Sequence, residues 1–283
     1  MEIKSLGNTG FDAIFEAFDR AFADYEVRLD KEQLRTMLRR RGFEPALSFA
    51  AFDGERIAAF TLNGTGGFDG TPTAYDTGTG TLKEYRGQGL ATNIFEHSVP
   101  RLREAGIRQY LLEVLQHNTG AVSVYRKLGF ETVREFDYGM QENAAVVFPA
   151  GIPEISHEVR TLDIGSFVPP AAFWDFAPSW QNSTEAVQRA AGDFIGLGAY
   201  AGERLAGYCI FEPASGDITQ IAVDREFRRK GFATLLLREA LRHNEYPTVK
   251  AINTDTACRS MAGFLEARNI GAKGRQFEMI RKI

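Results

Sequence analysis

The chain has 283 residues, of which 44% are hydrophobic, 25% are charged and 12% are aromatic, and its formal net charge is −4. This length suits two average domains better than one, and the apolar content is that of packed cores and not of a disordered chain. A net acidic chain argues against a nucleic-acid-binding protein, which usually carries a strongly basic face, and mildly favours cationic small substrates.

The positions of cysteine and histidine and the hydropathy of the chain argue against metal-binding, disulfide-rich and membrane-spanning proteins. The two cysteines, Cys209 and Cys258, and the four scattered histidines show none of the spacings typical of a metal site or of a disulfide framework. No apolar run approaches the ~18 residues that a membrane-spanning helix needs, and the first residues lack the apolar core of a signal peptide. We therefore expect a cytoplasmic protein with no metal, no membrane partner and no nucleic-acid partner.

Hydrophobic periodicity predicts elements in the same order in both halves of the chain. The first half predicts a strand near Ile3, helices at 11–22 and 31–40, strands at 47–52, 56–62 and 73–82, a helix at 89–104, a strand at 109–115, a helix at 119–127 and a strand at 131–138. The second half predicts strands at 158–162, 194–200, 204–211, 217–223 and 277–280, and helices at 173–180, 183–191 and 231–243. Pro100 is expected to kink or shorten the helix that contains it.

Two sequence segments recur in register, which indicates an internal duplication. Residues 51–60 recur at 199–208, and residues 86–91 recur at 228–233. Proline and glycine cluster at 148–153, as is typical of a linker. The chain is therefore predicted to fold as two α/β domains in tandem, at 1–148 and 155–283.

A glycine-containing turn between a strand and a helix stands at the centre of each repeat. Such a turn aims several backbone N–H groups at one point, where the helix dipole adds positive charge, so it is suited to bind an anion. The alternative is an ordinary strand–helix turn, and no Walker loop or complete dinucleotide fingerprint occurs. The candidate anion-binding residues are Arg86, Gly87, Gln88, Gly89, Leu90 and Ala91 in the first repeat, and Arg228, Arg229, Lys230, Gly231, Phe232 and Ala233 in the second.

These residues resemble the GNAT acetyltransferase family, whose Gln/Arg-x-x-Gly-x-Gly/Ala turn binds the diphosphate of acetyl-CoA. Residues 118–130 are similar to the family's Asn-x-x-Ala-x-x-x-Tyr-x-Lys-x-Gly-Phe signature at every marked position. The resemblance covers nearly the whole chain and implies two GNAT-like domains, each a mixed, mostly antiparallel sheet flanked by helices. It also implies that acetyl-CoA is the acyl donor. Its pantetheine arm would lie where two strands splay, near Thr79, Gly80, Thr81 and Asn118.

By the same resemblance the first repeat is an N-acetyltransferase acting on a primary amine, and Tyr125 is its general acid. A phenol can protonate the departing thiolate. Glu113 and Asp76 are candidate bases, since burial would raise the pKa of either toward a useful value. The alternatives are a core tyrosine and two solvent-facing carboxylates. Asp24 and Glu26 lie in the helix connection where the family binds its acceptor, here a small molecule or a peptide, and could bind a cationic substrate; the alternative is a solvated loop.

The second repeat departs from the family at the position of the acid. Alignment places Leu265 where the first repeat has Tyr125, and Cys258 where it has Asn118. A leucine cannot donate a proton, so the second repeat either binds CoA without catalysis or catalyses without this acid. Two other functions stay open: an acyl-CoA-binding regulatory module without turnover, and two active domains with different acceptors.

Overall fold

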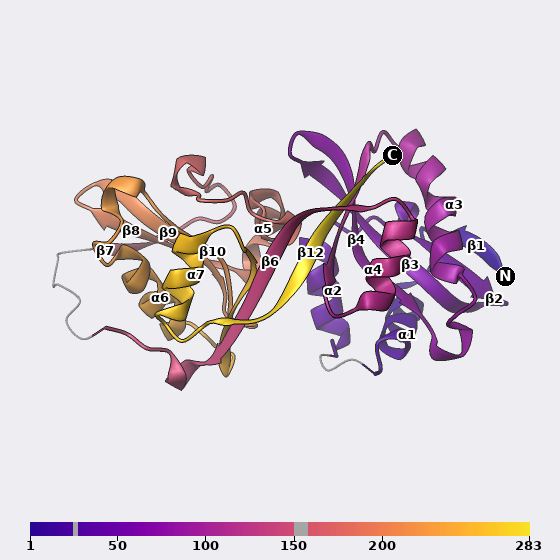
Figure 1. Cartoon of the computed structure of the whole chain (residues 1–283), viewed down its shortest axis with the longest axis horizontal. Coiled ribbons are helices and arrows are strands. Elements are labelled where there is room, and N and C mark those ends of the chain that lie inside the picture. The colour runs from indigo at the N-terminus through magenta and orange to yellow at the C-terminus, as the bar shows by residue number, and fades with distance from the viewer. Residues whose placement is uncertain (25–27, 150–157) are drawn as a thin grey trace. The chain divides into compact units, whose positions relative to one another are not determined.

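The computed structural model describes residues 1–24, 28–149 and 158–283. The chain forms two compact units (Figure 1): unit one is Met1–Val133 with Glu278–Ile283, and unit two is Arg134–Phe277. These limits differ from the ends of the two predicted domains, because each unit includes a strand segment from the other sequence repeat. Most of the predicted linker, and Glu26, lie outside the described residues.

Unit one is a mixed, mostly antiparallel sheet. Its strands run in the order β1-β2-β3-β4-β5, with the C-terminal part of β12 next to β5. From β1 to β4 neighbouring strands are antiparallel, whereas β4 and β5 run parallel. The elements are β1 (Glu2–Ser5), α1 (Phe11–Ala21), α2 (Lys31–Arg40), β2 (Phe49–Asp53), β3 (Arg56–Phe68), β4 (Thr71–Thr81), α3 (Leu90–Glu104), β5 (Gln109–Leu115) and α4 (Thr119–Lys127).

Helices cover both faces of this sheet, as the alternating side chains of β2 show. Phe49 and Ala51 pack in one buried cluster with residues of α3, whereas Ala50 packs in another with residues of α1 and α2. Asp30 caps α2 by accepting the N–H groups of residues 32 and 33. The expectation that Pro100 shortens α3 is wrong, since α3 continues to Glu104.

Unit two repeats this architecture with strands in the order β7-β8-β9-β10-β11-β6, followed by the N-terminal part of β12. The pair β10 and β11 runs parallel, as β4 and β5 do. The elements are β6 (Glu131–Glu142), β7 (Glu158–Leu162), α5 (Thr184–Arg189), β8 (Ile195–Ala201), β9 (Arg204–Glu212), β10 (Asp217–Val223), α6 (Phe232–Arg242), β11 (Thr248–Asp255), α7 (Arg259–Glu266) and β12 (Ala272–Lys282).

The helix predicted at 173–180 is wrong. Only single 3₁₀ turns occur there, at Ala171–Phe173 and Trp180–Asn182, and the residues between them are irregular. Pro178 explains the break, because proline lacks an N–H group and disfavours helical backbone in the residue before it. No helix among the described residues is long and apolar enough to cross a membrane.

Candidate active site

The predicted anion-binding turns have the same backbone conformation in both units. Gly87 and Gly89 have φ angles of 78° and 72°, and the matching Arg229 and Gly231 have φ angles of 61° and 92°. In each unit the second of these residues is the N-cap of the following helix, α3 or α6, and no side chain of the described residues caps either helix. The first N–H groups of α3 and α6 therefore have no side-chain acceptor and can bind an anion.

The β4–β5 pair opens beside this turn in unit one. Among the described residues, β4 pairs with β5 only from Thr73 to Tyr75, although β4 continues to Thr81. A β-bulge at Thr77 bends β4 just beyond the last pair. The backbone edge at 79–81 that faces away from β3 is thus left without a β5 partner, and it can offer hydrogen bonds to a ligand.

Asp76 and Tyr125 meet at this opening. The phenolic oxygen of Tyr125 donates a hydrogen bond to Oδ2 of Asp76 at 3.1 Å, across 49 residues of sequence. Thr79 Oγ1 and the backbone N–H of Gly78 donate to the same carboxylate, at 2.8 and 2.9 Å. Burial raises the pKa of Asp76 to about 6, and the hydrogen bonds from Thr79 and Tyr125 oppose this rise.

The remaining signature residues hold α4 in place. The side chain of Asn118 accepts the N–H of Ala121 and so caps α4. Phe130 packs edge-on against the ring of Tyr125, with 5.7 Å between the ring centroids. The signature of residues 118–130 therefore positions the Tyr125 hydroxyl at the strand opening.

A family model supports the assignment that this geometry suggests. The model described as "Acetyltransferase (GNAT) family" matches residues 11–130 and 158–254, which are more than half of the chain. The chain belongs to the GNAT acetyltransferase family. Both units carry the match, so the GNAT duplication is confirmed.

Individual GNAT relatives are similar over part of the chain. N-alpha-acetyltransferase 30 of Schizosaccharomyces pombe is 33% identical over 87 residues, which are 30% of this chain and 58% of that protein. Mycothiol acetyltransferase of Thermobifida fusca is 34% identical over 121 residues, which are 40% of this chain and 38% of that protein. The chain thus spans less than two thirds of the length of either relative.

Several solved structures are similar over nearly the whole chain. One of them is a tandem GNAT protein from the clavulanic acid biosynthesis pathway, with a TM-score of 0.72 and 16% identity, covering 99% of this chain and 98% of that one. At this identity the likeness shows the fold alone, and that fold is two GNAT domains in tandem.

Glu113 also lies at the GNAT strand opening of unit one. It stands on β5 two residues beyond Leu111, which is the last β5 residue paired with β4. Its carboxylate accepts a hydrogen bond from the hydroxyl of Tyr75. Burial and this neighbouring carboxylate raise the pKa of Tyr75 well above its ordinary value. The structure thus places all three predicted catalytic residues at one opening, on β4, β5 and α4.

The arginine of each GNAT turn bonds to the protein itself. In unit one, Arg86 donates from Nε to the carbonyl oxygen of Thr81 at 3.2 Å and from Nη2 to that of Ala21 at 2.9 Å. Its Nη1 lies 3.5 Å from the carboxylate of Asp24. The Arg86 side chain therefore joins the end of α1 to the end of β4, and its guanidinium is occupied by protein acceptors.

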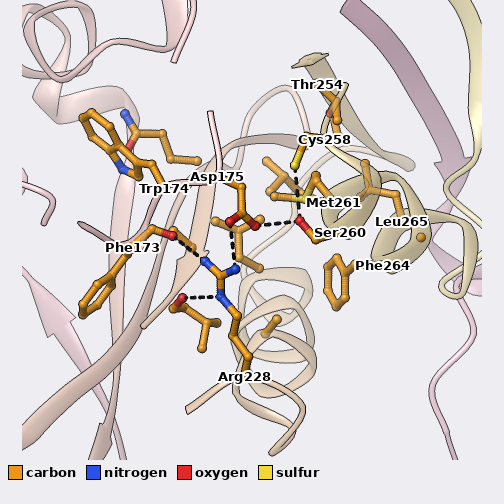
Figure 2. A pocket seen from close by; sticks show the side chains of 18 of the residues that line it. Phe173, Trp174, Asp175, Arg228, Thr254, Cys258, Ser260, Met261, Phe264 and Leu265 are labelled. Atoms are coloured by element: carbon orange, nitrogen blue, oxygen red, sulfur yellow. Dashed lines mark hydrogen bonds and ion pairs between the residues drawn. The ribbon is translucent and has the colours of Figure 1, made fainter. Parts of the chain in front are cut away.

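Arg228 makes the matching bonds in unit two, to the carbonyl oxygens of Val223 and Phe173, both at 3.1 Å. Figure 2 shows its additional ion pair with Asp175, at 2.7 Å, and the bond from Ser260 Oγ to the same carboxylate, at 2.6 Å. Burial would raise the pKa of Asp175, but the hydrogen bonds from Ser260 and Arg228 outweigh it and lower that pKa. This bridge could not be predicted from sequence patterns, because its three members lie far apart in the chain.

A cavity of about 670 Å³ lies in unit two between this bridge, the turn and α7 (Figure 2). The whole second turn, Arg228 to Ala233, lines it, together with Phe173, Trp174 and residues of β10, β11 and α7. Leu265 lines it as well, where unit one has Tyr125. Unit two therefore has a cavity beside its anion-binding turn.

Proposed function

We propose that unit one transfers an acetyl group from acetyl-CoA to a primary amine of a small molecule or peptide. The observation that carries this proposal is the hydrogen bond between Tyr125 and Asp76, at the opening of β4 beside the uncapped N-terminus of α3. Family membership supports acyl transfer in general. The relatives named above are an N-alpha-acetyltransferase and a mycothiol acetyltransferase, and these names favour an amine as the acceptor.

Acetyl-CoA would be held mainly by backbone groups. The N–H groups of residues 87–91 would face the diphosphate, and the helix dipole of α3 would add to the attraction. The N–H of Arg86 already donates to the carbonyl oxygen of Lys83. The pantetheine arm would pair with the free edge of β4 at 79–81. The Arg86 side chain acts here as a brace for the turn, since its donors already bond to protein oxygens.

Three side chains would share the chemistry. Glu113 accepts the proton that the acceptor ammonium must lose, directly or through one water. The free amine then attacks the thioester carbon, and the C–S bond breaks as Tyr125 gives its proton to the departing sulfur. The second proton that the nitrogen loses returns to the Tyr125 oxygen, directly or through water. The products are an N-acetyl amine and the free thiol of CoA. Asp76 would position Tyr125, because its carboxylate accepts the hydrogen bond of the Tyr125 hydroxyl and is itself held by the donors of Gly78 and Thr79.

Release of CoA thiol on addition of a panel of amines tests this proposal. We expect release with the wild-type chain and its loss in Tyr125→Phe. Binding of acetyl-CoA without release for any amine would favour the alternative of a regulatory module. We also propose a cytoplasmic setting, on the ground that both cysteines are buried free thiols and form no disulfide.

A further inference from the structure

The cavity of unit two keeps the anion-binding turn but has an apolar centre. The β-bulge at Thr219 in β10 corresponds to the bulge at Thr77 in β4, since each lies the same number of residues before the anion-binding turn of its unit. This register places Ile218 where unit one has Asp76. Both residues are buried, with 4% and 8% of their surface exposed, so the change replaces a carboxylate by a hydrocarbon at a closed position.

Two further replacements also exchange a polar side chain for an aliphatic one. The register that matches the bulges places Ile221 where unit one has Thr79, and Leu265 stands where unit one has Tyr125. Ile218, Ile221 and Leu265 all line the cavity. The carboxylate, hydroxyl and phenol that meet in unit one are therefore three aliphatic side chains in unit two.

Three polar side chains that line the same cavity, those of Trp174, Tyr208 and Gln220, are joined by hydrogen bonds. Tyr208 donates to Oε1 of Gln220 at 2.9 Å, and Nε2 of Gln220 donates to the carbonyl oxygen of Asn182 at 2.6 Å. The indole N–H of Trp174 donates to the Tyr208 hydroxyl at 2.5 Å. Because these donors already have acceptors, an apolar ligand can lie against them without leaving them unsatisfied.

We propose that unit two binds the CoA thioester of an acyl chain longer than acetyl and retains it without transfer. The turn from Arg228 to Ala233 would hold the diphosphate, and the chain would lie against Ile218, Ile221 and Leu265. Unit two has no group at these three positions that can orient or donate a proton, so the thioester persists. The proposal shares with the proposed function the assignment of the turns to the diphosphate, and it does not depend on catalysis in unit one.

Tryptophan fluorescence can report on unit two alone. The chain has two tryptophans, Trp174 and Trp180, and both belong to unit two. Trp174 lines the cavity. We would titrate the full chain carrying Gly89→Val with acetyl-, butyryl- and hexanoyl-CoA, and follow the emission together with the heat of binding. The substitution removes binding at the first turn, so that unit one neither consumes nor competes for the ligand.

We expect affinity to rise about fourfold per added methylene, which corresponds to about 0.8 kcal/mol for each buried CH₂. Butyryl-CoA should thus bind roughly 15-fold more tightly than acetyl-CoA. Leu265→Tyr should cut the ratio of butyryl-CoA to acetyl-CoA affinity to below about threefold. If this variant does not fold, Ile221→Thr can replace it and should lower the same ratio by a smaller amount.

Equal or tighter binding of acetyl-CoA would overturn the proposal, as would the absence of both an emission change and a heat signal with all three esters. Release of CoA thiol by the butyryl-CoA complex of this variant in the presence of amines would also overturn it, since retention would then fail. Loss of acetyl transfer in the wild-type chain, with the chain-length dependence intact, would count against the function proposed for unit one only.

Discussion

Tyr125 and Asp76 are joined by a 3.1 Å hydrogen bond in unit one, and the corresponding positions of unit two are Leu265 and Ile218. The two polar residues are replaced together, although they lie on separate elements. A carboxylate buried without its phenol, or a phenol without its acceptor, would pay an uncompensated desolvation cost. The hydrogen-bonded pair is therefore present as a whole in unit one, and both of its members are replaced in unit two.

Tyr125→Phe is expected to lower the rate constant of acetyl transfer by about 10² to 10⁴, which is the usual contribution of acid catalysis. Acetyl-CoA affinity should stay within a few-fold, because the backbone of the turn and of β4 provides most of the contacts. Single-turnover kinetics would measure the chemical step. The matched control is Tyr85→Phe, which removes a tyrosine–aspartate hydrogen bond to Asp53 at the surface. Undiminished turnover in Tyr125→Phe would remove this residue from the mechanism.

The pKa of Asp76, raised to about 6, predicts opposite pH trends for rate and stability. The ionised carboxylate accepts the bond from Tyr125, so the ratio of wild-type to Asp76→Asn kcat should rise with pH through about 6. Comparing this ratio cancels the titration of the acceptor amine and of Glu113. A flat ratio between pH 5 and 8 would contradict the positioning role.

Stability should change in the reverse direction. The pKa of Asp76 is higher in the folded state than in the unfolded chain, so the folded state binds more protons between about pH 4 and pH 6. The unfolding free energy of the wild type relative to Asp76→Asn should therefore fall as pH rises through this window, by up to about 3 kcal/mol. Denaturant unfolding at several pH values measures it.

Gly89→Val is expected to abolish acetyl-CoA binding in unit one. No atom lies within 4 Å of the added Cβ, so the effect comes from the φ of +72°, which a β-branched residue strongly disfavours. The turn must then change its path and its N–H groups no longer converge. Gly54→Val is the matched control, because Gly54 has a φ of +62°, has equally open surroundings and lies in the β2–β3 hairpin. The assignment of the first turn to acetyl-CoA would be supported if both variants lose similar stability but only Gly89→Val loses affinity for acetyl-CoA.

The exchanged strand segments predict which fragments fold. A fragment of residues 1–150 lacks the segment Glu278–Ile283 of unit one, and a fragment of residues 155–283 lacks the segment of β6 that belongs to unit two. We expect both to be less stable than the fragment 134–277, which retains the whole of unit two. Circular dichroism during thermal unfolding would compare them. Full activity and stability of residues 1–150 alone would contradict the exchange.

Local patterns predicted most of the elements and both turns, because the turn at Gly89 and the hairpin at Gly54 depend on short-range backbone preferences. The strands β6 and β12 were predicted as strands, but their partners were not, since alternation along a strand carries no information about which edge it joins. The contact between Asp76 and Tyr125 escaped prediction for a similar reason, as it depends on a bulge that brings distant residues together. The apolar spacing of residues 173–180 predicts a helix, but Pro178 lacks the N–H group that a helix needs. The backbone of this segment is therefore irregular.

The division of β12 between the units has a consequence for biosynthesis. Unit one takes its last strand segment from Glu278–Ile283, which the ribosome makes only after every residue of unit two. The half of the protein that is translated first is thus the last to complete its sheet, whereas domains commonly mature in the order of their synthesis. Until those residues emerge, the edge of β5 that they will cover is open to pairing with other strands.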